Sequence, residues 1–146
     1  MRAATIPLAT ALTVVLAACS AGATSSPDAG DAPRTVTATL NDDMRIELSE
    51  SDFGVGETVI FEVTNEGLGR HEFYLGDEEA QMHHAEEMAD MGSGMMHDEE
   101  DGVTVEPGET KTLEYTFHAG GEMLAGCHEP GHYEAGMSAP MMVAEE

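Results

Sequence analysis

The chain has 146 residues, of which 29 are acidic and only five are lysine or arginine, so its formal net charge is −24 at pH 7. Such a surface repels a phosphate backbone, which argues against nucleic acid as a partner. The charge suits docking of a basic protein or attraction of cations, and adaptation to high salt is the alternative explanation. Once an N-terminal leader is set aside, the remaining length suits one domain of about a hundred residues.

The N-terminal segment MRAATIPLATALTVVLAACS is typical of an export signal, with one early charge at Arg2, an apolar run and small residues before Cys19. About twenty apolar residues are needed to cross a bilayer, so a retained transmembrane helix is the weaker interpretation. The letters LAAC, residues 16–19, resemble the lipobox of bacterial lipoproteins, which implies cleavage before Cys19 and acylation of its thiol. We therefore expect residues 1–18 to be a lipoprotein signal peptide, and an ordinary secreted protein cleaved nearby is the alternative.

Residues 19–33 are predicted to be the acylated cysteine and a flexible tether, because SAGATSSPDAGDAP contains no large apolar side chain that could join a core. Two or more acyl chains on Cys19 would anchor the product stably. We expect an exported protein in the cell envelope, held on a bacterial membrane by lipid alone and facing the periplasm or the exterior. Acylation of Cys19 leaves Cys127 as the remaining thiol, so no internal disulfide can form and Cys127 is either a liability or a ligand.

Residues 34–146 form the predicted domain, in which alternating apolar and polar residues indicate half-buried strands. The alternation occurs in TVTATL, MRIEL, VIFEV, HEFYL and LEYTF, at residues 35–40, 44–48, 59–63, 71–75 and 113–117. Turn signals such as NEGLG, EPGE and AGGE separate these runs. The pattern predicts an all-β, antiparallel sandwich and not a parallel α/β sheet.

One segment, at about residues 76–101, breaks this pattern because it contains no β-branched residue and no Phe, Tyr or Trp. We interpret it as an insertion between two strands. Its first half is predicted to be a short helix, with one face formed by His84, Met88, Met91 and Met95. The segment is rich in soft or borderline metal donors, which suit labile metal sites; the alternative is a helix whose methionine stripe caps the sandwich. The candidate donors are Met82, His83, His84, Met88, Met91, Met95, Met96 and His97.

The loop AGCHEPGHYEAGM, residues 125–137, gathers several metal-ligating side chains in one short stretch. By strand parity, the Cys127 side chain points toward the interior of the sandwich. The spacing Cys-x4-His-x4-Met then allows a thiolate, an imidazole and a thioether to surround one point, using Cys127, His132 and Met137. His128 follows the cysteine directly and is expected to face solvent.

His71 is the candidate fourth ligand, because it begins a predicted strand on the inward face of Phe73 and Leu75. A buried imidazole needs a partner; a metal supplies one, and a backbone carbonyl in the core is the alternative. Two imidazoles, a thiolate and a weak axial thioether suit copper in electron transfer. Zinc more often takes four strong ligands, and calcium and magnesium prefer oxygen. The sequence therefore predicts one copper site that alternates between Cu(I) and Cu(II).

From about residue 34 onward the sequence resembles the cupredoxins, the blue copper proteins related to plastocyanin and azurin. The resemblance rests on VTNEGLGRHEFYL, VEPGETKTLEYTF and GCHEPGHYEAGM, in the order that this family uses. It implies an eight-stranded Greek-key β-sandwich with one type 1 copper site at one end. Glu72 stands where many relatives have an asparagine that helps to fix the cysteine loop. The copper ligands that the resemblance implies are His71, Cys127, His132 and Met137.

Two functions are compatible with the sequence. The first is single-electron transfer by a monomer between redox partners, and the full four-ligand set places it first. The second is copper handling, meaning scavenging, tolerance or delivery to a copper-trafficking partner, with the donors of the insertion as secondary copper ligands. An enzyme is not expected, because copper nitrite reductases and multicopper oxidases need a second copper domain and His-x-His pairs.

Overall fold

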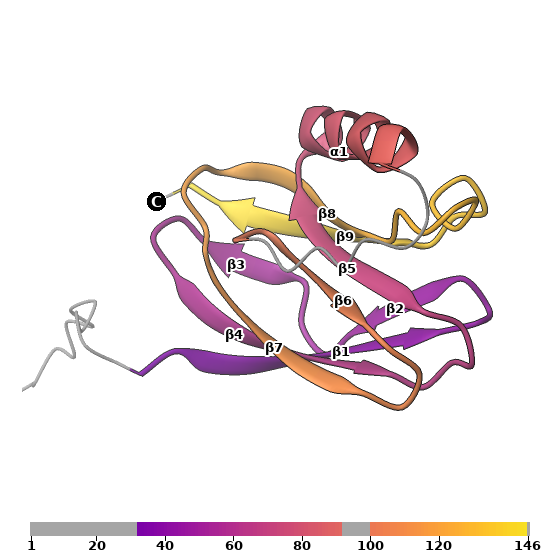
Figure 1. Cartoon of the computed structure of the whole chain (residues 1–146). Helices are drawn as coiled ribbons and strands as arrows, with labels where there is room; N and C mark the ends of the chain where they lie inside the picture. Colours follow the sequence, from indigo (N-terminus) through magenta and orange to yellow (C-terminus); the bar gives the residue numbers. More distant parts are fainter. Residues whose placement is uncertain (1–31, 92–99, 146) are drawn as a thin grey trace, which may run out of the picture. The chain divides into compact units, whose positions relative to one another are not determined.

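The computed structural model describes residues 32–91 and 100–145, which form a β-sandwich of two sheets. One sheet has the strand order β2-β1-β4-β7 and the other has the order β3-β9-β8-β5-β6. The single helix of the described residues, α1, lies on the outer side of the second sheet, against β5 and β8 (Figure 1). The predicted all-β sandwich with a helical insertion is confirmed. Among the residues that the structure describes, no helix is long and apolar enough to cross a membrane.

The elements in chain order are β1 (Arg34–Asn41), β2 (Arg45–Leu48), β3 (Asp52–Gly54), β4 (Thr58–Asn65), β5 (His71–Gly76), α1 (Glu78–Met91), β6 (Gly102–Val105), β7 (Thr110–Thr116), β8 (Gly121–Gly126) and β9 (Ser138–Ala144). The five predicted strands correspond to β1, β2, β4, β5 and β7. The described residues contain nine strands where the resemblance implies eight. One reason is that the chain crosses from one sheet to the other between β2 and β3 and contributes a strand to each.

Two of the strand pairings are parallel, so the predicted antiparallel sandwich is not antiparallel throughout. β1 pairs with β4 in parallel, and β3 pairs with β9 in parallel, whereas the other pairs are antiparallel. The chain leaves the first sheet after β2, joins the second sheet as β3 and returns as β4 beside β1. Such a crossing allows parallel neighbours without a helical connection.

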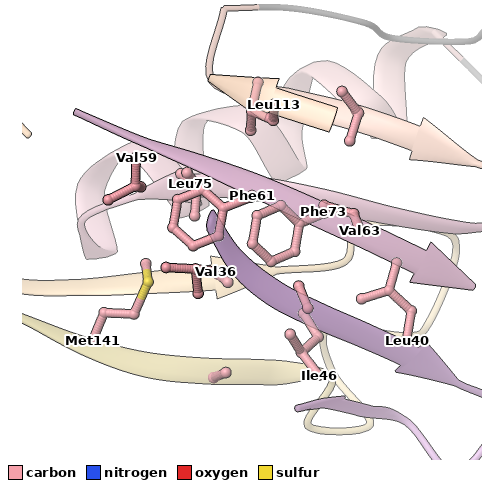
Figure 2. Packing of buried hydrophobic residues seen from close by; sticks show 14 of the residues in the cluster. Val36, Leu40, Ile46, Val59, Phe61, Val63, Phe73, Leu75, Leu113 and Met141 are labelled. Carbon is pink, nitrogen blue, oxygen red and sulfur yellow. The ribbon is translucent and has the colours of Figure 1, made fainter. Parts of the chain in front are cut away.

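The inward faces of the two sheets meet in an apolar core (Figure 2). Phe61 from β4 packs against Phe73 from β5, with ring centroids 5.3 Å apart, and so joins the two sheets. The core extends to Cys127 and Met137, which are both fully buried. The loop predicted to hold the metal therefore begins and ends in the apolar interior.

The insertion lies between β5 and β6, which pair directly with each other in antiparallel register. Asp77 caps the helix, because its carboxylate accepts the Ala80 N–H at 2.9 Å. Glu78 and Glu79 occupy the first turn, where the helix dipole favours negative charge. The insertion thus extends a strand hairpin and leaves the sandwich intact.

Several predictions fall on residues outside those that the structure describes. They concern the signal peptide, Cys19 and most of the tether, together with Met95, Met96, His97 and the side chain of Met91.

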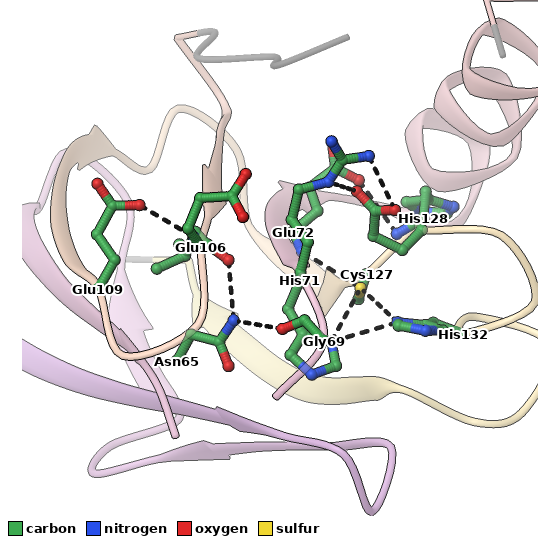
Figure 3. Close-up of polar contacts among 12 residues, drawn as sticks. Asn65, Gly69, His71, Glu72, Glu106, Glu109, Cys127, His128 and His132 are labelled. Atoms are coloured by element: carbon green, nitrogen blue, oxygen red, sulfur yellow. Dashed lines mark hydrogen bonds and ion pairs between the residues drawn. The ribbon is translucent and has the colours of Figure 1, made fainter. Parts of the chain in front are cut away.

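Asn65, the last residue of β4, holds the loop that leads to His71. Its side chain is fully buried and donates from Nδ2 to the carbonyl oxygens of Gly69, at 2.8 Å, and Val105, at 2.9 Å (Figure 3). Its Oδ1 accepts the Gly67 N–H at 2.8 Å. One amide therefore links β4, the following loop and β6, and fixes the start of β5.

Asn65→Ala should destabilise the metal-free protein by roughly 2–4 kcal/mol, because two carbonyls lose their donor and a buried unsatisfied polar group costs about 1–3 kcal/mol. Asn41→Ala is the matched control, since Asn41 Oδ1 accepts the Asp43 N–H at 3.1 Å in an exposed turn. We expect that control to change stability by less than about 0.5 kcal/mol. Urea denaturation followed by circular dichroism measures both variants, and equal losses would contradict this account of Asn65.

Candidate metal centre

Three potential ligands converge at one end of the sandwich (Figure 3). His71 begins β5, Cys127 follows the last residue of β8, and His132 lies in the next loop. The two histidine Nδ1 atoms are 3.2 Å apart, and Cys127 Sγ lies 3.4 Å from His132 Nδ1 and 3.9 Å from His71 Nδ1. Within residues 32–91 and 100–145, this is the one cluster of three or more His, Cys, Asp or Glu side chains whose ligand atoms converge in this way.

The dimensions of this triangle fit a metal ion. The point equidistant from its three corners lies about 2.0 Å from each atom, close to the bond lengths of about 2.0 Å to nitrogen and about 2.3 Å to sulfur that zinc sites show. His71 and Cys127 are fully buried, whereas His132 is partly exposed. Two imidazoles and a sulfur in this arrangement suit a soft cation such as copper.

Backbone hydrogen bonds close the loop that carries the cysteine. The Cys127 N–H donates to the Met137 carbonyl at 3.1 Å, and the Met137 N–H donates to the His132 carbonyl at 3.0 Å. Gly131 and Gly136 adopt positive φ angles of 83° and 96°, which glycine tolerates best. This pairing brings Met137, the predicted axial ligand, next to Cys127 in the buried interior.

Asp42, in the turn between β1 and β2, fixes the other ring nitrogen of His71. Its Oδ1 lies 3.1 Å from His71 Nε2, and its carboxylate also accepts the N–H groups of Leu68 at 2.7 Å and Gly69 at 3.1 Å. These two backbone donors, with a smaller contribution from His71, hold the pKa of the Asp42 carboxyl below its usual value. A carboxylate on Nε2 leaves the Nδ1 lone pair available for a metal. Sequence reasoning missed Asp42, because nothing local indicates that this turn reaches the histidine.

Glu72 connects β5 to the cysteine loop. Its buried carboxylate accepts the His128 backbone N–H at 3.1 Å, and its own backbone N–H donates to Cys127 Sγ at 3.3 Å. The other carboxylate oxygen lies 2.9 Å from His84 Nε2. Glu72 thus fixes the cysteine loop, the role that the resemblance gives to asparagine.

A second connection joins the residue before His71 to the same loop. Arg70 and Glu129 form a two-point ion pair, with Nε 2.6 Å from Oε1 and Nη2 3.1 Å from Oε2. The hydrogen bond that Arg70 donates to Glu129 raises the pKa of Arg70. Because the fork geometry of an arginine–carboxylate pair is directional, the pair sets both the spacing and the orientation of the two segments.

Burial controls the protonation of the metal-free centre. Burial raises the pKa of the Cys127 thiol to about 12, against the partial opposing effect of backbone N–H groups. Burial also lowers the pKa of His132, and the neighbouring His71 lowers it further. At neutral pH the metal-free protein therefore holds a neutral thiol beside a neutral His132. A bound cation reverses this preference, because a coordinated thiol is deprotonated.

The expectation that His128 faces solvent was wrong. Its side chain is only 6% exposed, and its Nε2 lies 2.7 Å from Gln81 Oε1 of the helix. Burial lowers its pKa, which keeps the ring neutral. The spacing of the loop could not reveal this partner, because Gln81 lies 47 residues earlier in the chain.

The donors predicted in the helix divide between its two sides. His84 is 2% exposed and bonded to Glu72, so its Nε2 is already occupied in this structure. Met88 is half-buried, and Met82 and His83 are exposed. Of the face expected from His84, Met88, Met91 and Met95, the structure describes the first two side chains, and both lie on the inner side of the helix, where the polar Gln81 joins them.

No family model matches the chain, but individual proteins do. A copper-resistant cuproprotein CopI from Rubrivivax gelatinosus is 36% identical over 116 residues, which cover 80% of this chain and 70% of the relative. The protein of the same name from Pseudomonas aeruginosa is 32% identical over 143 residues, covering 79% of this chain and 78% of the relative.

Solved structures give the same fold. Reduced auracyanin from Roseiflexus castenholzii superposes with a TM-score of 0.62 at 20% identity, covering 79% of this chain and 99% of that chain. Auracyanin A from Chloroflexus aurantiacus, described as a blue copper protein, superposes with a TM-score of 0.59 at 20% identity. The match covers 77% of this chain and 100% of that chain.

In the metal-free protein we expect Cys127 to stay protonated up to about pH 10, because burial raises its pKa from 9.0 to about 12. The unfolded chain loses this proton first, so the contribution of the thiol to the free energy of unfolding is present below about pH 9 and is lost as the pH rises toward 12. Ultraviolet absorbance of the thiolate follows the titration in a Cys19→Ser variant, in which Cys127 is the one thiol. The same protein unfolded in urea is the control and should titrate near pH 9; a folded sample that titrates there too would refute the assigned burial.

Proposed function

Because the chain belongs to the family of the CopI copper-resistant cuproproteins, we propose that it handles copper for tolerance by means of one type 1 centre. The protein is a copper-binding, cupredoxin-like protein. The observation that carries the proposal is the convergence of two imidazole nitrogens and a buried sulfur at one point. The residues to which we assign the ion are His71, Cys127, His132 and Met137.

The surroundings of the centre support capture and retention of copper. Cys127 lies in the apolar interior, where a thiolate bound to a cation is shielded from exchange with water. His132 is partly exposed and offers the side from which an ion or a partner approaches. Asp42 and Glu72 hold the ligands before any metal arrives, so little ordering is required on binding. Copper bound there supplies a centre that alternates between Cu(I) and Cu(II).

Single-electron transfer is the second candidate function. The observation that favours it is the prearranged triangle, because fixed ligands limit rearrangement between two oxidation states. The sequence alone placed this function first. The name of the relatives supports copper handling, and we therefore reverse the order.

We further propose that the protein works outside the cytoplasm as a lipid-anchored monomer without enzymatic activity. The support for the anchor is the LAAC sequence that ends at Cys19. The formal net charge of −24 favours a basic protein partner, either a redox protein or a copper-trafficking protein.

Two variants distinguish copper handling from electron transfer. Cys127→Ser should abolish the intense thiolate charge-transfer band and also copper tolerance, because it removes the sulfur ligand. Met137→Leu should keep copper but shift the reduction potential, because the axial thioether is a weak ligand. Growth of a strain that lacks the protein is measured at graded copper, with each variant restored. If the Met137→Leu strain grows at the same copper concentrations as the unaltered strain, copper handling is supported. If its copper tolerance falls as the reduction potential shifts, electron transfer is supported. A band that persists in Cys127→Ser would overturn the site.

The donors of the insertion should bind additional copper without colour. We expect the unaltered protein to bind more than one copper ion. A variant in which most donors of the insertion are replaced should bind one copper ion, with the same charge-transfer band. An anaerobic titration with bound copper counted at each step measures both proteins. Equal uptake would remove the insertion from copper storage. His84 is left in place because it is bonded to Glu72, and Met88 because it is half-buried and lines a pocket beside the Cys127 loop. The variant carries leucine at Met82, Met91, Met95 and Met96 and glutamine at His83 and His97.

A further inference from the structure

The helix α1 buries polar side chains where a helix lying on a sheet ordinarily buries apolar ones. Gln81 is fully buried and His84 is 2% exposed. Burying a polar group costs free energy unless the group is hydrogen-bonded. These two side chains therefore need specific hydrogen-bond partners. Their partners lie in β5, in β8 and in the loop that carries Cys127.

The first connection runs from His84 through Glu72 to the sulfur. His84 Nε2 lies 2.9 Å from one oxygen of the Glu72 carboxylate, and the other oxygen accepts the His128 N–H at 3.1 Å. The Glu72 backbone N–H then donates to Cys127 Sγ at 3.3 Å. His84 therefore lies one residue away from a direct contact with the candidate ligand.

The second connection runs through Gln81. Its Nε2 donates to the carbonyl oxygens of Tyr74, at 3.2 Å, and Leu124, at 2.9 Å, which lie on the paired strands β5 and β8. Its Oε1 is thereby the acceptor for His128 Nε2–H at 2.7 Å. A Cβ atom at Gly126 would overlap Gln81 Oε1, so the approach of the helix depends on glycine at that position.

Ring stacking holds the two histidines in these orientations. The His84 ring stacks on Tyr74 with centroids 3.8 Å apart and an angle of 2° between the planes. The His128 ring stacks on Tyr133 with centroids 4.5 Å apart and an angle of 20°. The rings lie between the helix, β5 and the loop, so the helix and the loop are held as one packed unit.

We propose that α1 is a positioning element of the copper centre, in which His84 and Gln81 hold Glu72 and His128 so that Cys127 keeps its direction toward His71 and His132. This inference rests on the proposed copper centre. It gives the inner side of the insertion a role different from that of its exposed donors. His84 then acts on the metal through Glu72, without contact to the ion.

The adjacent histidines His83 and His84 provide a matched pair for the test. The His83 side chain is 72% exposed, and it pairs with Glu87 on the same helix. His84→Leu and His83→Leu make the same chemical change on the same turn, but only the first removes a partner from Glu72. Both variants are studied in the full chain, first without metal and then with one copper.

In the metal-free protein, hydrogen exchange at the His128 amide should be at least about tenfold faster in His84→Leu, the scale expected when a buried hydrogen-bonded group loses its partner. Exchange at amides of β1 and β4 should stay unchanged. In the copper-loaded protein, the same variant should shift the charge-transfer band and the reduction potential while still binding one copper. With no more than one copper bound, His83→Leu should leave all of these readouts at the values of the unaltered protein. Its proposed role as a secondary donor concerns only copper beyond the first equivalent.

The outcomes separate positioning from general stability. Faster exchange spread evenly over the core, with the band and potential unmoved, would overturn the proposal. If His84→Leu does not fold, His84→Gln is compared with His83→Gln. The N–H donor that glutamine retains should restore part of the protection of the His128 amide against exchange. Equal exchange at that amide in the two glutamine variants would also overturn the proposal. If the unaltered protein shows no charge-transfer band, the proposed copper centre fails, and the exchange result alone decides whether α1 positions the loop.

Discussion

The burial of His71 and Cys127 in an apolar interior is the constraint from which the rest of the centre follows. Neither group can rely on water, so every polar atom around them needs a partner within the protein. Asp42 satisfies the far nitrogen of His71, and the Glu72 N–H approaches the sulfur. The same burial keeps the thiol protonated without metal, which makes a soft cation the natural counterpart of the site.

The sandwich supplies this constraint through strand register. Tyr74 pairs with Gly126 across β5 and β8, and continuing that register by two residues sets Glu72 opposite His128. The hydrogen bond between the Glu72 carboxylate and the His128 backbone lies at that position. The candidate ligands at the start of β5 and just beyond β8 are therefore brought together by sheet pairing, and the loop needs only to return His132 to the same place.

Sequence reasoning recovered the parts of the structure that follow from local periodicity. Five strands alternate visibly, and the ligand spacing is contained in one loop. β6 was missed because it is buried along its whole length and does not alternate, and β9 because Met, Ala and Pro are weak strand signals. Asp42 and Gln81 were missed for another reason: their partners lie 29 and 47 residues away, and no local pattern carries such a contact.

Under the two proposals made for it, the insertion serves two purposes at once. A period of 3.6 residues separates His83 from His84 by about 100° around the helix axis, so one histidine faces solvent and the other faces the sheet. The inner positions require specific hydrogen-bond geometry and tolerate little change, because Gln81 alone bridges two strands and the loop. The outer positions carry no such constraint, so the number and kind of exposed donors can vary without disturbing the centre beneath them. A helix fixed on its inner side by polar bonds is thus free to acquire metal donors on its outer side.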